Sequence, residues 1–236
     1  MTVAIVGVGG LGCPAAYALA RMGLALRLLD EDRVERSNLH RQMLFDEGDV
    51  GRPKVEAAAR ALAGRAPVEP VASHVAPDNA LALLAGCALV VEGSDNLATK
   101  FMVADACRVL NVPVVHGACV GWRATVLPVA WGRGACYRCV FEDLPAGEDA
   151  PDCATAGVYG PVTSVVGALM AADALALLAG DFARAGALAR YDGWAQSFRA
   201  TRFDRRPDCP LCGDGAPLPA LTASRYSIGC ALDETP

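Results

Sequence analysis

A chain of 236 residues is long enough to bury a substantial core in one large domain, alone or with a small appendage. Its formal net charge is −5 and its acidic and basic residues are mixed along the sequence, so it lacks the clustered positive charge that binds nucleic acids or anionic membranes. No nucleic-acid partner is therefore expected. The start of the chain has no secretory signal, which predicts a cytoplasmic protein.

Strands alternate with helices over the first half of the sequence. Strands are predicted at residues 2–6, 25–29, 68–75, 88–91, 112–119 and 125–129, and helices at residues 14–22, 54–63 and 97–110. This alternation is typical of an α/β fold with a Rossmann-like, doubly wound and mostly parallel sheet.

The second half is less regular. Residues 142–152 are rich in Pro, Gly and acidic side chains and predict a mobile loop, whereas residues 190–203 predict two late strands in an antiparallel extension of the sheet. The apolar run at residues 158–180 approaches the length of a membrane span, but Gly160-Pro161 interrupts its start and Asp173 lies inside it. We therefore predict a buried core helix and no membrane contact.

A glycine-rich turn follows the first predicted strand. The glycines are Gly7, Gly9, Gly10 and Gly12. Backbone N–H groups at such a turn bind anions, and the missing side chains let a phosphate approach. Asp30 closes the next strand, where Rossmann folds place a carboxylate against a ribose. The pattern predicts a nucleotide site and leaves an NAD- or FAD-dependent enzyme open.

Three charged side chains favour nucleotidyl transfer. Arg41, in Ser37-Asn38-Leu39-His40-Arg41-Gln42, and Lys54, in Gly51-Arg52-Pro53-Lys54, would offset the charge that develops on phosphate, and hydride transfer needs no such groups. Asp95 follows an apolar strand, where open α/β sheets place functional groups, and its carboxylate suits Mg²⁺. Each of the three also fits a solvated charge or a helix cap.

Cysteine pairs predict a metal site. The paired positions are Cys136, Cys139, Cys209 and Cys212. Two CxxC pairs in a cytosolic protein match a closed zinc site of four thiolates, with a redox CxxC motif as the alternative. Such a site would tie the C-terminal region back to the middle of the chain. Cys87 and Cys107 lie in apolar runs and are expected to be buried.

Together these motifs resemble the E1-like sulfur-carrier adenylyltransferases, the family of the molybdopterin-synthase and thiamine sulfur-carrier adenylyltransferases. The resemblance runs in order through the glycine turn, Leu29-Asp30, residues 37–42, residues 51–54, Ser94-Asp95-Asn96 and both cysteine pairs. It implies an E1-like adenylation domain with zinc knuckles at residues 1–213. Residues 214–236 form a tail with no assigned counterpart.

The resemblance also implies roles for individual residues. These are phosphate approach at Gly10, ribose binding by Asp30, phosphate contacts from Asn38, Arg41 and Lys54, and Mg²⁺ binding by Asp95 with Asn96 beside it. A small ubiquitin-fold sulfur-carrier protein ending in Gly-Gly would attack ATP at its α-phosphorus through its terminal carboxylate. The products would be an acyl-adenylate and pyrophosphate, the cofactors ATP, Mg²⁺ and Zn²⁺, and the assembly a homodimer.

Two features of the resemblance leave alternatives open. Cys153 matches a family cysteine that can form a thioester, persulfide or acyl-disulfide but is dispensable in some members. Members usually also carry, ahead of the first strand, a helix with an arginine that reaches the ATP phosphates of the partner subunit. This chain starts almost at the strand, so a truncated start, a replacement group and weakened turnover all stay open. A degenerate subunit that binds a carrier without turnover is the alternative function.

Overall fold

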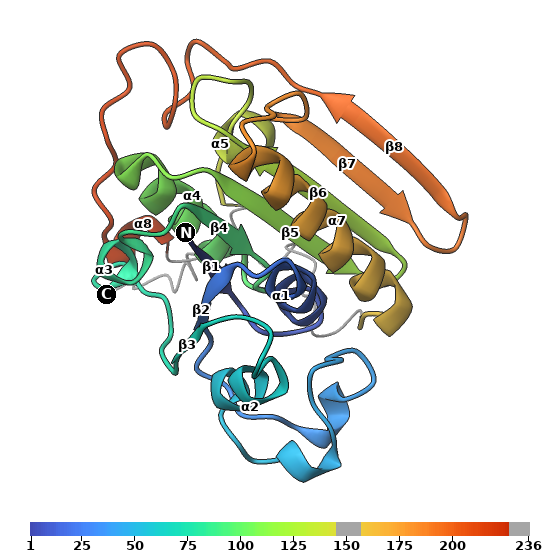
Figure 1. Cartoon of the computed structure of the whole chain (residues 1–236). Helices are drawn as coiled ribbons and strands as arrows, with labels where there is room; N and C mark the ends of the chain where they lie inside the picture. The colour runs from blue at the N-terminus through green and yellow to red at the C-terminus, as the bar shows by residue number, and fades with distance from the viewer. Residues whose placement is uncertain (145–156, 227–236) are drawn as a thin grey trace, which may run out of the picture.

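The computed structural model describes residues 1–144 and 157–226, and within them eight strands form one sheet (Figure 1). The strands are β1 (Thr2–Val6), β2 (Ala25–Leu29), β3 (Val68–Val71), β4 (Leu89–Glu92), β5 (Val114–Val120), β6 (Arg123–Val129), β7 (Ala187–Asp192) and β8 (Ser197–Arg202). They lie in the order β3-β2-β1-β4-β5-β6-β7-β8. The first five strands pair in parallel, and β6, β7 and β8 add antiparallel, which confirms the predicted fold class.

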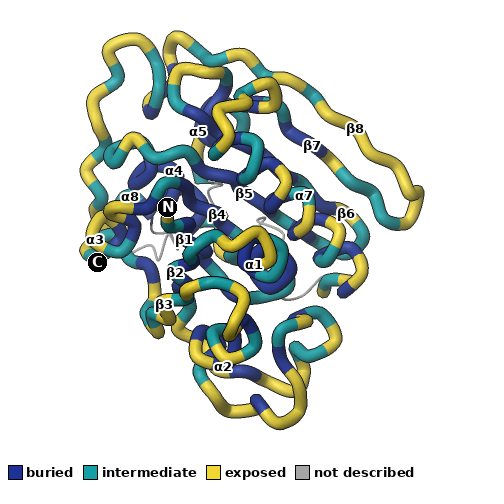
Figure 2. Tube along the Cα trace, viewed as in Figure 1, coloured by how far each residue is buried: buried dark blue, intermediate teal, exposed yellow. Residues whose placement is uncertain are grey.

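Helices cover both faces of the sheet (Figure 1). One face carries α1 (Gly12–Arg21), α2 (Lys54–Ala61) and α7 (Gly160–Leu178). The other carries α3 (Ala80–Leu84), α4 (Leu97–Leu110), α5 (Tyr137–Phe141) and α8 (Ala223–Tyr226). Two short 3₁₀ helices, η1 (Arg36–Asn38) and η2 (Glu47–Asp49), lie between β2 and α2. The inner strands are buried while β8 is largely exposed at the sheet edge (Figure 2).

Predicted and observed elements differ mainly at their ends. β1, β2 and α4 have the predicted bounds, and both late strands are present as β7 and β8. The third strand ends at Val71 instead of residue 75, because the N–H of Ser73 donates back to the Val71 carbonyl (2.9 Å) and turns the chain away from the sheet. Of the predicted mobile loop, residues 145–152 lie outside the described residues.

The long apolar run folds as α7 and packs on β5, β6 and α1. Among the described residues it is the one helix whose length and mean hydropathy of 1.8 would suit a membrane span. Half of this apolar stretch is nevertheless buried within the protein. Its Asp173 is also buried and pairs with Arg184 at 2.9 Å. These contacts confirm the prediction of a core helix.

The chain after Cys212 is anchored at one buried carboxylate. Asp105 of α4 is fully buried and accepts two hydrogen bonds from Arg138 of α5, at 2.8 and 3.0 Å. It also accepts one from Arg225 (2.8 Å) and one from the Tyr226 hydroxyl (2.9 Å). A buried carboxylate requires such partners to offset its lost hydration. The weak periodicity after Cys212 did not reveal this attachment, and the division after residue 213 stays a prediction.

Candidate functional site

A cavity of about 680 Å³ lies at the carboxyl ends of the parallel strands. Strand order reverses between β1 and β4 at this edge, which is where open α/β sheets bind ligands. The predicted nucleotide residues that line it are Gly7, Gly9, Gly10, Asp30, Asn38, Arg41, Lys54, Asp95 and Asn96. The fold therefore brings residues from five separate sequence motifs into one site.

The glycine turn between β1 and α1 depends on glycine at two positions. Gly7 has a φ of +82°, and a Cβ there would lie 3.0 Å from the Ser94 nitrogen. A Cβ on Gly12 would overlap the Gly7 carbonyl oxygen. Gly12 thus shapes the turn from behind. The Cys13 N–H at the start of α1 already donates to the Gly9 carbonyl (3.0 Å), so an anion would bind to the N–H groups of the turn before it.

Asp30 connects the glycine turn to Lys54. Its carboxylate accepts hydrogen bonds from the backbone N–H groups of Val8 (2.7 Å) and Asp32 (2.9 Å). Burial raises the pKa of Asp30, and the nearby Lys54 charge and these two N–H groups oppose the rise. Lys54 Nζ lies 2.6 Å from Asp32 Oδ2 and 3.9 Å from Asp30 Oδ1. Each Asp30 oxygen keeps a lone pair that can accept a hydrogen bond from a ribose hydroxyl.

Asn38 and Arg41 form one hydrogen-bonded unit at the other side of the cavity. Arg41 Nη2 donates to Asn38 Oδ1 at 2.6 Å, and both side chains are half-buried. Arg41 forms no ion pair within residues 1–144 and 157–226, so its charge is available to a ligand.

The side chains of Asp95 and Asn96 differ in their hydrogen bonding. The Asn96 side chain caps α4 by accepting a hydrogen bond from the Thr99 N–H at 3.1 Å. Asp95 is exposed at the cavity and makes no hydrogen bond or ion pair within the described part of the chain. Asn96 thus fixes the start of the helix, and the adjacent Asp95 presents a free carboxylate.

The sequence analysis missed a buried ion pair beneath this loop. Lys100 Nζ donates to Glu92 Oε2 (2.9 Å) and to the Gly117 carbonyl (2.6 Å), and His116 Nδ1 lies 3.3 Å from the same Glu92 oxygen. The Ser94 N–H donates to Glu92 Oε1 at 2.8 Å. The available signal was an acidic residue closing an apolar strand and a lysine one turn into the next helix. This network holds the segment that carries Asp95.

Replacing Glu92 with glutamine should destabilise the fold by about 3–5 kcal/mol, because it leaves Lys100 buried without its counter-charge. Burial disfavours ionisation of Glu92, but Lys100, His116 and Ser94 outweigh it and lower its pKa from 4.5 to about 2. A carboxylate with a depressed pKa contributes stability above the unfolded pKa and loses it as the pH falls toward the folded one.

The free energy of unfolding, measured by urea titration, should therefore differ most between wild type and Glu92→Gln at neutral pH. This difference should become smaller as the pH falls below about 4.5. Glu69→Gln is a matched control, since Glu69 pairs with Arg27 at 2.8 Å but its side chain is 56% exposed. That substitution should cost at most about 1 kcal/mol. Equal losses of unfolding free energy from the two substitutions would contradict the large contribution that we assign to the buried Glu92–Lys100 pair.

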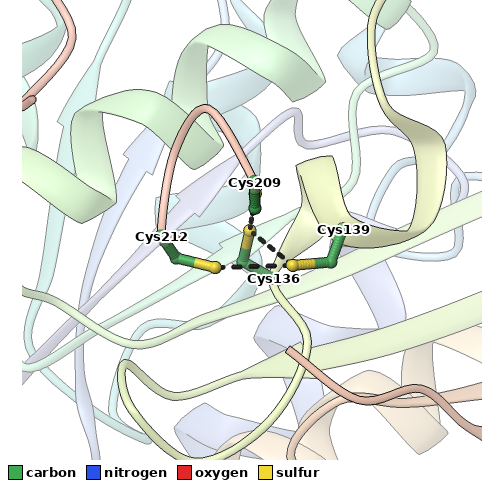
Figure 3. Close-up of side chains that lie close together, drawn as sticks. All are labelled: Cys136, Cys139, Cys209 and Cys212. Atoms are coloured by element: carbon green, nitrogen blue, oxygen red, sulfur yellow. Dashed lines mark hydrogen bonds between the residues drawn. The ribbon is translucent and has the colours of Figure 1, made fainter. Parts of the chain in front are cut away.

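The four paired cysteines meet in one cluster (Figure 3). Cys136 precedes α5 and Cys139 lies on it, whereas Cys209 and Cys212 belong to a turn after β8. In that turn the Gly213 N–H donates to the Cys209 carbonyl at 2.9 Å. A Cβ on Gly213 would lie 2.5 Å from this oxygen, so the turn requires glycine.

The spacing of the sulfur atoms fits one tetrahedral zinc ion. All four Sγ atoms lie within 4.8 Å of one another. Individual separations are 3.7 Å for Cys136–Cys139, 3.6 Å for Cys136–Cys209 and 3.4 Å for Cys139–Cys212. A zinc ion with Zn–S bonds of about 2.3 Å holds its thiolates about 3.8 Å apart. The convergence of both pairs favours a zinc ligand set over an independent redox motif.

The structure tests the predictions for two of the remaining cysteines and not for the third. Cys87 is 5% exposed and Cys107 fully buried, which confirms the expectation for both. Burial raises the pKa of each thiol and keeps it protonated and unreactive. Cys153 lies outside the described residues, so its covalent or spectator role stays a prediction.

Comparison with known proteins places this site in a family. The ThiF family matches residues 1–211. The chain is 40% identical to the SAMP-activating enzyme E1 of Haloferax volcanii over 98% of this chain and 86% of that protein. It is 42% identical to the sulfur carrier protein adenylyltransferase of Thermus thermophilus, over 90% of this chain and 82% of that protein. The crystal structure of E. coli MccB with ATP superposes with a TM-score of 0.74 and 26% identity, over 90% of this chain and 66% of that chain. Because this family model spans most of the chain and both relatives are about 40% identical over nearly their full length, the chain belongs to the ThiF family.

Proposed function

We propose that this chain uses ATP to adenylate the C-terminal carboxylate of a small ubiquitin-fold sulfur-carrier protein, with release of pyrophosphate. The observation that carries the proposal is the meeting of an anion-binding glycine turn, two cations and a free carboxylate at one cavity. The relatives named as a SAMP-activating enzyme E1 and a sulfur carrier protein adenylyltransferase support the same activity.

Each part of the cavity has a role in ATP binding. The glycine turn receives phosphate oxygens, and Asp30 accepts a ribose hydroxyl. Arg41, held by Asn38, and Lys54, held near Asp30, supply positive charge from two sides. The MccB structure solved with ATP supports a nucleotide in this place. Asp95, with no partner among the described residues, is suited to hold Mg²⁺, which would neutralise phosphate charge when bound.

The reaction needs no nucleophile from this chain. A carboxylate oxygen of the carrier's terminal glycine forms a bond to the α-phosphorus, and the bond from that phosphorus to the pyrophosphate oxygen breaks. Negative charge grows on the departing pyrophosphate and on the equatorial oxygens. Arg41 and Lys54 offset this charge, which is the main contribution a protein makes to such transfers.

The cysteine cluster has a structural role in this proposal. Cys136, Cys139, Cys209 and Cys212 would hold Zn²⁺, and none of the four lines the cavity. The ion would fasten the turn after β8 to α5. The proposal also includes a homodimer and a cytoplasmic location, as the family resemblance implies.

Exchange of labelled pyrophosphate into ATP tests the activity directly. We expect exchange that depends on addition of a carrier, using as a panel the ubiquitin-fold proteins ending in Gly-Gly that the same genome encodes. Removal of the terminal glycine from the active carrier should abolish it. Cys153→Ala should retain exchange, because adenylation forms no bond to a cysteine.

Two results would count against the proposal. Absence of exchange with every carrier that binds the chain would favour a degenerate subunit without turnover. Flavin colour in the purified protein, or NADH binding in the cavity, would favour an oxidoreductase instead.

A further inference from the structure

The side chain of Gln42 is buried at the cavity, and the fold gives it no hydrogen bond. Gln42 is 3% exposed and lines the cavity, and its Oε1 atom has no hydrogen-bond partner in the described part of the chain. Its Nε2 group also donates to no residue in 1–144 or 157–226. A buried amide without partners costs stability, and most buried polar groups in proteins are hydrogen-bonded. The fold therefore does not account for an amide at this position.

Backbone hydrogen bonds hold Gln42 in the turn that carries Arg41. The Gln42 N–H donates to the Asn38 carbonyl, and the Phe45 N–H donates to the Gln42 carbonyl, both at 3.1 Å. The Asn38 side chain in turn holds the Arg41 guanidinium at 2.6 Å. The turn that presents a cation to the cavity thus also presents an amide, whose own donor and acceptor stay unused within the described residues.

Gly9 lies opposite this amide, and the fold does not require glycine there. A Cβ on Gly9 would lie 3.8 Å from Gln42 Nε2, an ordinary contact distance, and would meet no other atom within 4 Å beyond its sequence neighbours. Gly7 and Gly12 differ, because a Cβ on either would come within 3.0 Å of the backbone. The Gly9 N–H has no acceptor within residues 1–144 and 157–226. Gly9 and Gln42 therefore border a common space, each with an unused donor.

The chemistry of this space suits an anionic oxygen. A backbone N–H in a glycine turn and a side-chain NH2 group are both donors, and a phosphate oxygen only accepts. Hydrogen bonds to a charged acceptor are about twice as strong as those between neutral groups. The Gln42 Oε1 atom can accept from a water molecule that accompanies the phosphate. A ligand of this kind would satisfy both the amide and the Gly9 N–H.

We propose that Gln42 binds ATP directly, by donating from Nε2 to a phosphate oxygen that also receives the Gly9 N–H. The inference rests on the proposed function and adds a contact to its nucleotide. Arg41 and Lys54 supply charge to the same cavity, whereas the Gln42 amide supplies a neutral, directional donor fixed by its burial. A donor that is already in place loses little freedom when the nucleotide binds.

Gln42→Met separates a phosphate contact from a structural role. Methionine has nearly the same length but has no amide, so the substitution removes no hydrogen bond of the described fold and removes a buried unsatisfied acceptor. The melting temperature should therefore stay equal or rise. A glutamine that serves only the fold predicts a lower melting temperature and unchanged nucleotide binding.

The measurement is the dissociation constant for Mg²⁺–ATP and for adenosine, by titration calorimetry. Gln42→Met should bind ATP about 10- to 100-fold more weakly, the usual loss when a hydrogen bond to a charged group is removed. Adenosine has no phosphate, so its affinity should not change. Gln196→Met is the matched control, because it removes an exposed amide in the turn between β7 and β8, and it should bind both ligands as the wild type does.

Gly9→Ala tests the same space from its other side. Its Cβ makes only the 3.8 Å contact with Gln42 Nε2, so the melting temperature should stay near that of the wild type. The methyl group would occupy the space of the phosphate oxygen, and ATP affinity should fall while adenosine affinity stays unchanged. In the exchange assay both variants should raise the KM for ATP and leave the KM for carrier unchanged.

Unchanged ATP affinity in Gln42→Met would overturn the contact, even if exchange is robust and the proposed function stands. Equal losses for ATP and adenosine would also overturn it, since they would indicate a general change of the cavity. A raised KM for carrier with unchanged ATP affinity would assign the amide to the carrier's carboxylate instead of the phosphate. Weaker ATP binding by Gln42→Met, in a chain that shows no exchange with any carrier, would keep the phosphate contact and refute the activity.

Discussion

Asp95→Asn is expected to reduce carrier-dependent ATP–pyrophosphate exchange by about 100- to 1,000-fold, the usual loss when one group that stabilises transition-state charge is removed. Asp95 lines the cavity, is exposed and has no partner within the described residues, so its carboxylate is free to bind Mg²⁺. An amide of the same shape lacks the charge that a divalent cation requires. The exchange rate at saturating ATP and carrier measures the effect.

The melting temperature of Asp95→Asn should equal that of the wild type, since no contact of the fold is removed. Asp204→Asn, which changes an exposed aspartate outside the cavity in the same way, should leave exchange unaffected. If Asp95→Asn were as active as Asp204→Asn, the magnesium assignment would be wrong. A loss of activity that accompanies unfolding would also contradict it.

The sequence predicted the sheet because its strands carry local signals. β1, β2 and β4 are short apolar runs bounded by glycine or acidic residues, and buried parallel strands have this pattern. The glycine turn also fixed the position of the cavity, since ligands bind at the carboxyl ends of such strands. Convergence of Asp30, Arg41 and Lys54 on that cavity follows from the topology, which the alternation of elements already implied.

Contacts between distant residues could not be predicted in the same way. Lys100 and Glu92 are eight residues apart, but their burial depends on Gly117 and His116 from the neighbouring strand β5. Tyr226 reaches Asp105 across 121 positions, and neither residue lies in a recognisable motif. Such pairs depend on how the layers pack, and no local periodicity reports that packing.

Two arginines of β7 and β8 show a third case, in which the sequence contains the residues but not their relationship. Arg190 and Arg199 are ordinary surface residues until the register of β7 and β8 places them opposite each other. Only the pairing turns two solvated charges into an unfavourable contact between like charges.

Removal of two zinc ligands is expected to lower the melting temperature by about 6–12 °C, which corresponds to about 3 kcal/mol for a chain of this size. Cys209→Ala/Cys212→Ala leaves Cys136 and Cys139 unable to complete a tetrahedral site. Zinc stabilises isolated zinc-finger peptides by roughly 10 kcal/mol or more. The loss should be smaller here because the sheet has hydrophobic cores of its own.

Elemental analysis should find about one zinc per wild-type chain and none in the double variant. Cys107→Ala, which changes a fully buried cysteine outside the cluster, should keep its zinc and cost only about 1 kcal/mol. A zinc-free wild type with an unchanged melting temperature in the double variant would contradict the zinc site. The turn at Cys209 and Cys212 directly precedes the segment in which the Tyr226 hydroxyl donates to Asp105. Loss of the metal should therefore also weaken this contact of Tyr226. Faster hydrogen exchange at residues 214–226 would report the change.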